Sequence, residues 1–217
     1  MAGEGEAHDA VRRSYDAVAQ TYYDRLRDEL NGKPLDRALL RLLAEDAGAG
    51  ASVADVGCGP GHVAAWLAGL GQGAVGIDLS PSMVELGCAR YPAVEFRVGD
   101  ILDLPAADGE FAAAVALYVL IHLAPDELSR AAGELWRVLR PGGLLLVAFH
   151  AGDEVRHLDD WWEHEVDLDF RFLSLSDVAD VLRDAGFVIE ASLERRPYVG
   201  EADTRRGYVL ARRPSFS

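Results

Sequence analysis

Short apolar runs alternate with amphipathic stretches along most of the chain. The runs have the length of buried strands, and the stretches repeat their apolar residues with the period of a helix. Strands that alternate with helices are typical of a mostly parallel sheet with helices on both faces, so we expect an α/β fold. The predicted strands are 52–56, 74–77, 94–98, 111–117 and 144–149, and the predicted helices between them are 62–70, 80–90 and 126–138.

Two further helices are predicted ahead of the first strand. The first covers 10–30 and has one apolar face. The second covers 35–47 and begins next to Pro34, a residue favoured in the first turn of a helix. The apolar face of the first helix is formed by Val11, Tyr15, Val18, Tyr22 and Leu26.

The last third of the chain departs from this alternation. Apolar and charged residues alternate over 165–172, which predicts a half-buried strand. A helix capped by Ser176 follows and ends at Ala185. Two strands, 187–196 and 205–213, come last. Because we expect only a short turn between them, they should pair antiparallel as a hairpin at the sheet edge.

Composition and charge narrow the possible partners. The 217 residues are 50% hydrophobic, which is enough for a sizeable core. The formal charge of −15 argues against nucleic acid and against an anionic membrane surface, since both attract cationic proteins. Two cysteines, Cys58 and Cys88, indicate neither a disulfide framework nor a metal cluster. The chain has no signal-peptide pattern and no run long enough to span a bilayer, so we expect a soluble cytoplasmic protein without a metal site.

A glycine-rich turn separates the strand 52–56 from the helix that follows it. The segment VADVGCGPG places Gly57, Gly59 and Gly61 where a ligand can approach backbone N–H groups at the positive end of a helix. Nicotinamide-dependent oxidoreductases use the related spacing G-x-G-x-x-G, which this turn lacks. A tight turn with purely structural glycines is the remaining interpretation.

Five segments, in this order, resemble the class I S-adenosylmethionine-dependent methyltransferase family. They are SYDAVAQTYYDRL, DVGCGPG, VGIDLS, VGDILDLP and LRPGGLLLV. The resemblance is close over roughly 14–149 and follows the rest of the chain in outline. It implies a Rossmann-like, seven-stranded, mostly parallel sheet whose last strand is antiparallel. It also implies S-adenosyl-L-methionine as cofactor, with S-adenosyl-L-homocysteine as its product.

The same resemblance implies roles for individual residues. Asp78, at the end of the second strand, should accept hydrogen bonds from the ribose hydroxyls. Asp100 should accept one from the adenine amino group, with the Ile101 backbone facing the ring. Asp55 should orient the glycine turn and the amino end of the cofactor. The alternatives are capping for Asp55 and Asp78 and core packing for Met83. The other residues expected around the cofactor are Gly57, Cys58, Gly59, Gly61, Leu79, Met83 and Leu117.

Aromatic residues are expected on both sides of the transferred methyl group. Tyr15 and Tyr22 can close over the cofactor, because aromatic ring faces attract a sulfonium. Their spacing fits a buried helical stripe equally well. Trp161 and Trp162 should line the substrate side, unless one of them only anchors the surrounding segment.

The candidates for catalysis are histidines that follow the predicted strands. The sulfonium already activates the methyl group, so a general base is needed only when the nucleophile carries a proton. Ligands in open α/β sheets bind at the carboxyl ends of strands, so His122 and His150 rank above His157 and His164. Tyr15 is the third catalytic candidate, and His150 should also contact the substrate. A surface or capping role is the alternative for each histidine.

We therefore expect one methyltransferase domain over 1–217 that methylates a small organic acceptor at O, N, C or S. A nicotinamide-dependent oxidoreductase is the first alternative. A protein that binds S-adenosylmethionine without methylating, or uses it for cyclisation or elimination, is the second. The protein should be a monomer, or a homodimer paired through the apolar face of 166–172. Its expected parts are an N-terminal helical cover (1–48), a cofactor-binding core (49–150), a substrate cap (151–175), and a helix with a hairpin (176–217).

Overall fold

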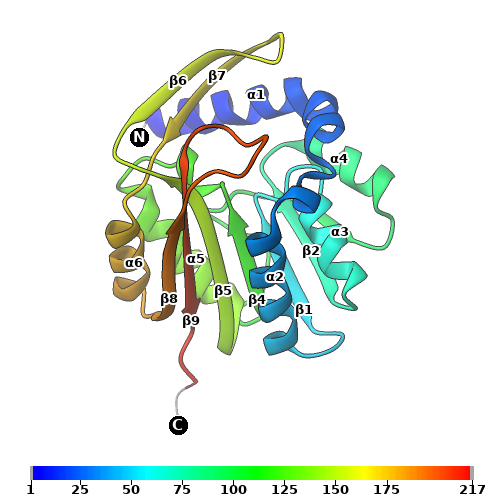
Figure 1. Ribbon diagram of the computed structural model, residues 1–217, viewed down its shortest axis with the longest axis vertical. Helices are drawn as coiled ribbons and strands as arrows, with labels where there is room; N and C mark the ends of the chain where they lie inside the picture. The colour runs from blue at the N-terminus through cyan, green and yellow to red at the C-terminus, as the bar shows by residue number, and fades with distance from the viewer. Residues whose placement is uncertain (1, 216–217) are drawn as a thin grey trace.

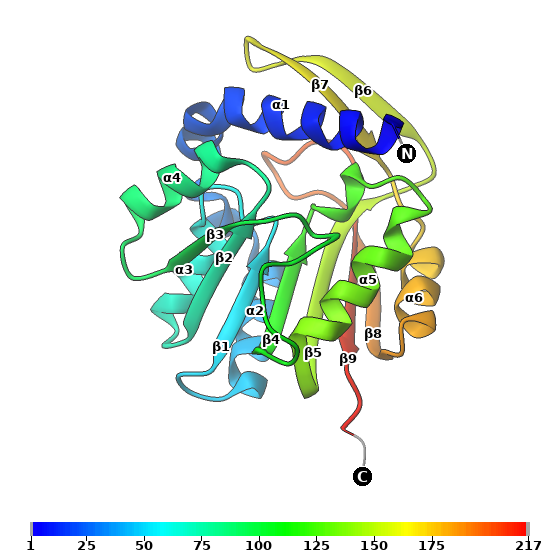
Figure 2. The same ribbon diagram turned by 180° about the vertical axis from the view of Figure 1, so that it is seen from behind.

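A computed structural model describes residues 2–215 of the chain (Figures 1 and 2). Residues 1 and 216–217 of the predicted domain lie outside this range. The helices are α1 (Ala2–Leu26), α2 (Pro34–Ala47), α3 (His62–Gly69), α4 (Pro81–Arg90), α5 (Glu127–Val138) and α6 (Leu175–Asp184), with short 3-10 helices η1 (Glu29–Gly32) and η2 (Leu120–His122). The strands are β1 (Ser52–Val56), β2 (Gly73–Asp78), β3 (Glu95–Val98), β4 (Phe111–Leu117), β5 (Leu139–Ala151), β6 (Val155–Trp161), β7 (His164–Arg171), β8 (Val188–Arg195) and β9 (Arg205–Arg212).

Seven of these strands form one sheet in the order β3-β2-β1-β4-β5-β9-β8. β1 pairs in parallel with β2 and β4, and the pairs β2–β3 and β4–β5 are parallel as well. β9 pairs antiparallel with both β5 and β8. The predicted Rossmann-like sheet with an antiparallel last strand is therefore confirmed.

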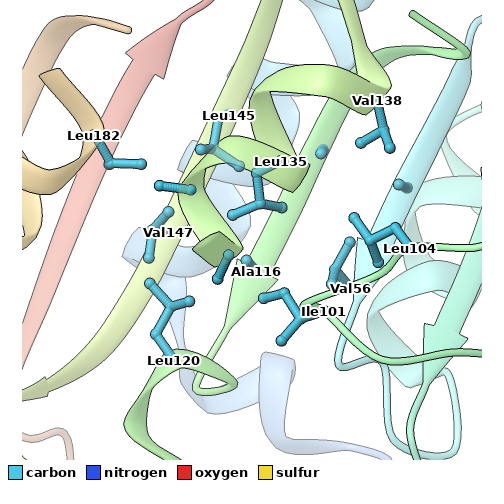
Figure 3. Close-up of a cluster of buried hydrophobic side chains, with 14 of the residues drawn as sticks. Val56, Ile101, Leu104, Ala116, Leu120, Leu135, Val138, Leu145, Val147 and Leu182 are labelled. Carbon is cyan, nitrogen blue, oxygen red and sulfur yellow. The ribbon is translucent and has the colours of Figure 1, made fainter. Parts of the chain in front are cut away.

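Helices cover both faces of this sheet. On one face, Leu135 of α5 and Leu182 of α6 belong to a buried cluster that extends across the sheet as far as Val56 of β1 (Figure 3). On the other face, Leu40 of α2 and Leu67 of α3 belong to a second cluster. Apolar burial on both faces fixes the carboxyl ends of the parallel strands, which is the edge where ligands bind in such sheets.

The helix α1 and the hairpin β6–β7 form a roof over that edge (Figures 1 and 2). A third apolar cluster holds the roof together, with Val18 and Ala19 of α1 against Val166 and Leu168 of β7. Because α1 covers this apolar face of β7, the prediction that the face pairs two copies of the chain is wrong.

The first helix starts earlier and ends earlier than the predicted 10–30. It begins at Ala2, although Gly3 and Gly5 are poor helix formers, and this start has no apolar periodicity that would predict it. It ends at Leu26, and the chain then turns into η1. Within residues 2–215 no helix, α1 included, combines the length and the apolar character needed to cross a membrane.

Three predicted features of the last third are wrong in detail. The single predicted strand is one half of a hairpin, and β6 gave no signal because most of its residues are polar and exposed. The N-cap of α6 is Ser174 rather than Ser176, since its hydroxyl accepts the N–H of Asp177. β8 and β9 are joined by the loop 196–204 rather than a short turn, and this loop rises toward the roof (orange-red in Figure 1).

Candidate active site

A cavity of about 810 Å³ lies between the sheet and the roof. Segments that follow β1, β2, β3 and β4 line it together with the end of β5, and residues of the loop 196–204 line one side. Its volume is near the top of the roughly 300–1,000 Å³ range of small-molecule pockets, so there is room for two small ligands together.

The glycine-rich turn follows β1 at the floor of this cavity. Gly57, Gly59 and Gly61 have φ angles of +70°, +53° and +84°, a conformation that side chains rarely adopt. A Cβ on Gly57 would lie 2.5 Å from the Cβ of Val119, and one on Gly61 would lie 2.3 Å from Cζ of Phe96. The backbone conformation favours glycine at all three positions, and close packing also requires it at Gly57 and Gly61. Gly57 and Gly59 line the cavity, so their backbone is accessible to a ligand.

Asp78 lines the cavity from the carboxyl end of β2. Its carboxylate accepts the backbone N–H of Gly59 at 2.7 Å and that of Ser80 at 2.9 Å. Burial raises the pKa of Asp78 to about 6. Two backbone amides therefore orient this carboxylate without any help from a ligand.

Asp55 lies behind the cavity wall. It is 2% exposed, and its carboxylate accepts the N–H of Ala64 in the first turn of α3 at 2.9 Å. Burial raises the pKa of Asp55 to about 7. Cys58, Gly61 and Met83 also lie outside the lining, and Met83 is fully buried in the cluster beneath α1.

Asp100, which follows β3, lines the cavity and is joined to α1. Its Oδ2 lies 2.9 Å from Nδ1 of His8, whose Nε2 lies 3.0 Å from Oε1 of Glu127. Burial lowers the pKa of His8, but the two carboxylates raise it by more, so the pKa is above its ordinary value. His8 occupies a polar stretch without a motif and was not predicted. The other residues expected around the cofactor that line the cavity are Tyr15, Tyr22, Gly57, Gly59, Leu79, Ile101 and Leu117.

Tyr15 of α1 and His122 of η2 form a hydrogen-bonded pair in the cavity wall. The Tyr15 hydroxyl lies 2.7 Å from Nε2 of His122, and Nδ1 of His122 lies 3.1 Å from the backbone oxygen of Asp169 in β7. A carbonyl only accepts, so Nδ1 carries the ring proton and Nε2 accepts from Tyr15. Burial lowers the pKa of His122 to about 4 and raises that of Tyr15 far above its ordinary range. Both groups are therefore neutral near pH 7.

His150 lines the cavity near the end of β5. Its Nδ1 lies 2.8 Å from Oγ1 of Thr204, and Nε2 makes no hydrogen bond within residues 2–215. Burial, together with the positive charges of Arg206 and Lys33, lowers the pKa of His150 to about 4. His150 thus presents a neutral ring to the cavity.

Aromatic side chains of the roof form much of the cavity wall. Trp161 and Trp162 stack at the tip of the hairpin with ring centroids 4.5 Å apart. Tyr15 and Tyr22 meet Trp161 edge-on, at 5.9 and 5.8 Å. All four line the cavity, so the tyrosines belong to the site as well as to the apolar stripe of α1.

A charged wall at one side of the cavity was not predicted. Lys33 Nζ lies 2.6 Å from Oε2 of Glu29 and 3.7 Å from Oε1 of Glu201, and Arg206 lies 4.0 Å from Glu201. The four residues come from the region of η1 and from the loop 196–204 with the start of β9. No local pattern marks them, because their partners meet only in the folded chain.

The two lower-ranked histidines lie outside the cavity lining. His157 is exposed and bonds to Asp169 at 3.0 Å, and His164 lies 2.9 Å from Oγ1 of Thr21, which joins the hairpin to α1. In the part of the chain that the structure describes, no cluster of His, Cys, Asp and Glu has the arrangement of a metal site.

Comparisons with known proteins identify the family of the chain. Residues 53–143 match the family described as Methyltransferase domain. The chain is 31% identical over 167 residues to a probable S-adenosylmethionine-dependent methyltransferase of Mycolicibacterium smegmatis, covering 73% of this chain and 61% of that protein. It is 32% identical over 153 residues to a malonyl-[acyl-carrier protein] O-methyltransferase of Pectobacterium atrosepticum, covering 68% and 58%. The chain therefore spans about three fifths of the length of these curated relatives.

Among solved structures, the fold is similar to that of the 1,6-didemethyltoxoflavin-N1-methyltransferase of Burkholderia thailandensis. The TM-score is 0.73 at 22% identity, over 97% of this chain and 90% of that one. That protein was solved with 1,6-didemethyltoxoflavin and S-adenosylhomocysteine bound. Since the matched segment carries the glycine-rich turn and both curated relatives are more than 30% identical over more than two thirds of this chain, the chain belongs to the class I S-adenosylmethionine-dependent methyltransferase family.

Proposed function

We propose that this chain transfers a methyl group from S-adenosylmethionine to a small organic acceptor inside the cavity. One observation carries the proposal: a single cavity is lined both by the glycine turn with Asp78 and Asp100 and by the neutral histidines His122 and His150. A cofactor with ribose and adenine hydrogen-bond donors suits the carboxylates. The acceptor then occupies the histidine side of the same space.

The residues that line the cavity fit the chemical groups of the cofactor. Asp78 would hold the ribose hydroxyls, and Asp100 with Ile101 would hold the adenine. The ring faces of Tyr15 and Tyr22 suit the sulfonium, which supplies the activated methyl group when the cofactor is bound. Asp55, Cys58, Gly61 and Met83 would act from behind the wall, by holding the glycine turn and the base of the roof in place.

The acceptor is proposed to be small because the roof encloses it. Trp161, Trp162 and His150 would contact it, and the cover formed by α1 and the hairpin would exclude water during transfer. The atom methylated is O, N, C or S. The net charge of −15 supports a small-molecule acceptor rather than nucleic acid.

Calorimetric titration with S-adenosylmethionine, S-adenosylhomocysteine and NAD tests the cofactor. We expect both sulfur nucleosides to bind and NAD not to bind. Asp78→Asn should weaken their binding by about tenfold to a hundredfold, since each hydrogen bond to a charged group contributes roughly 1.5–3 kcal/mol.

Asp180→Asn is the matched control, because Asp180 lies on α6 and makes only an exposed pair with Arg183. It should leave binding unchanged. Binding of NAD in place of the sulfur nucleosides would overturn the proposal. So would bound cofactor that never gives S-adenosylhomocysteine with any acceptor tested.

A further inference from the structure

The Tyr15–His122 pair leaves an oxygen available to a ligand. Tyr15 donates its own proton to Nε2 of His122, and within residues 2–215 its oxygen accepts no hydrogen bond. Both side chains line the cavity. A ligand that donates a hydrogen bond to the Tyr15 oxygen would therefore complete a chain from ligand to Tyr15 to His122, with the Asp169 carbonyl holding the far side of the imidazole.

The walls beside this pair consist of flat rings. Phe170 lies 5.0 Å from the His122 ring and 5.6 Å from Trp161, and Phe172 lies 5.4 Å from the ring of His150 (centroid distances). All five line the cavity. Aromatic faces and edges at these distances favour a planar aromatic ligand, which packs against them in stacked or edge-on geometry.

Cations and carboxylates meet at the His150 side of the cavity, because Lys33, Arg206 and Arg156 each lie within 4.0 Å of a glutamate. Arg206, Lys33 and Arg156 each disfavour a second positive charge on His150. Burial lowers the pKa of His122 to about 4, so it is a weak base. Such a base suits a phenolic hydroxyl, with a pKa of about 10, better than an unconjugated hydroxyl, which is close to water at about 15.7.

We infer that the acceptor is a flat aromatic compound with a ring hydroxyl, and that this hydroxyl is methylated while it donates to the Tyr15–His122 pair. The inference rests on the proposed function and specifies its substrate class. Tyr15 is then the catalytic residue that touches the acceptor, and His122 acts through Tyr15.

The step balances without any further reactant. A lone pair on the acceptor oxygen forms the new O–CH₃ bond, and the S–CH₃ bond breaks with its electron pair remaining on sulfur. The hydroxyl proton passes to the Tyr15 oxygen as the Tyr15 proton passes to Nε2 of His122. The products are the methyl ether, S-adenosylhomocysteine and an imidazolium, which releases its proton to water after the ether leaves.

A panel of matched probes tests the acceptor class. It contains 1-naphthol, 7-hydroxycoumarin and 8-hydroxyquinoline, the saturated alcohol decahydro-1-naphthol, and an amine, a thiol and a carboxylic acid on the naphthalene ring. Formation of S-adenosylhomocysteine is measured with each. We expect at least one aromatic hydroxy probe to raise the rate tenfold or more, and decahydro-1-naphthol to have no effect.

The variants His122→Gln and His122→Asn test the proton route. Gln can still accept from Tyr15 at the Nε2 position, and Asn can still donate to Asp169 at the Nδ1 position, but neither is a base. Both should lower kcat by about a hundredfold to ten-thousandfold while KM stays within about threefold. His164→Gln, outside the cavity lining, should leave both constants unchanged, and cofactor binding in each variant shows that it is folded.

Each outcome separates the inference from the proposed function. Turnover confined to the amine, thiol, acid or saturated alcohol overturns the aromatic-hydroxyl class and leaves methyl transfer standing. An unchanged kcat in both folded His122 variants overturns the proton route, and absence of turnover with every aromatic hydroxy probe overturns the inference. Absence of cofactor binding in the wild type overturns the proposed function itself.

Discussion

Two neighbouring carboxylates lie at the ends of β1 and β2, Asp55 buried and Asp78 half-buried. Each accepts backbone N–H groups, and for each, burial raises the pKa, to about 7 and about 6. Asp78 lines the cavity, where hydrogen bonds from a ligand can stabilise its negative charge, whereas Asp55 lies behind the wall. The charge of Asp55 is therefore a standing cost to the folded state at neutral pH.

Asp55→Asn should change how stability depends on pH. The folded-state pKa of about 7 lies above the ordinary value of 3.8, so the folded state binds the extra proton. The wild type therefore loses stability as pH rises from about 4 to about 7, by at most about 1.4 kcal/mol per pH unit. Asn keeps the acceptor for Ala64 without the charge. Urea unfolding at pH 5, 6, 7 and 8 measures the free energy of unfolding. The difference between the variant and the wild type should increase in favour of the variant up to about pH 7.

The matched control for this experiment is Asp180→Asn on α6. The difference in unfolding free energy between this control and the wild type should not vary from pH 5 to 8, because Asp180 is exposed. A difference between Asp55→Asn and the wild type that is constant from pH 5 to 8 would mean that the Asp55 carboxyl titrates in the ordinary range.

Sequence alone predicted the site residues that belong to local motifs. The glycine turn, Asp78, Asp100 and the strand-end histidines follow from short segments, and the structure lines the cavity with most of them. His8 was missed because its partner Asp100 is 92 residues away. The hydrogen bond between Tyr15 and His122 spans 107 residues and was missed for the same reason.

At the scale of elements, the hairpin β6–β7 has an unusual turn. Trp162 and Glu163 have φ angles of +57° and +67°, which glycine or asparagine normally occupies. Trp162 is held there by stacking on Trp161 and by the guanidinium of Arg25, 5.1 Å from its ring centroid. Glu163 is exposed and has no such contact in the described chain. The turn therefore keeps a strained backbone that places two tryptophans over the cavity.

Glu163→Gly should stabilise the protein without altering cofactor binding. Relief of the positive-φ conformation contributes about 1 kcal/mol, which raises Tm by about 2–4 °C for a chain of this size. Glu165→Gly is the control, because Glu165 is equally exposed but lies in the extended strand β7, where glycine should lower Tm. Equal changes in Tm for the two variants would contradict the assignment of strain to position 163.

The elements with strong periodicity were predicted and the irregular ones were not. β1, β4 and β7 begin and end within one residue of their predicted bounds, because apolar runs or alternating apolar residues identify them in the sequence. β6 carries mostly polar residues, and its position is determined by antiparallel pairing with β7. The loop 196–204 has no periodicity, and Glu201, rather than a turn motif, determines its course.

At the scale of the whole molecule, a network of buried charges joins distant parts of the chain. Glu201 bonds to Arg195 at 2.5 Å and faces Lys33, and Arg195 reaches Asp36 of α2 at 3.2 Å. Glu29 continues the network to His62 of α3 at 2.9 Å. These ion pairs connect the loop 196–204 to α2, η1 and α3.

Glu201→Gln should destabilise the folded chain by about 3 kcal/mol. The change leaves Arg195, Lys33 and Arg206 buried with less compensating charge, and breaking a buried pair on one side costs roughly 3–5 kcal/mol. Urea unfolding measures the loss, and hydrogen exchange should report faster opening of 196–204.

Glu194→Gln is the comparison for this variant. Its partner Arg205 is 64% exposed, so the loss should be below about 1 kcal/mol. Losses of similar size in the two variants would mean that the buried network contributes no more than a surface pair.

The order of strands in the sheet has a consequence for how the chain folds while it is being synthesised. β9 lies between β5 and β8, so β8 is synthesised before the strand that attaches it to the sheet. Until Arg212 has emerged from the ribosome, the long edge of β5 has no partner and β8 has nowhere to dock. An unpaired apolar edge attracts strands of other chains. A delay between the appearance of β8 and that of β9 should therefore increase aggregation of the newly synthesised chain.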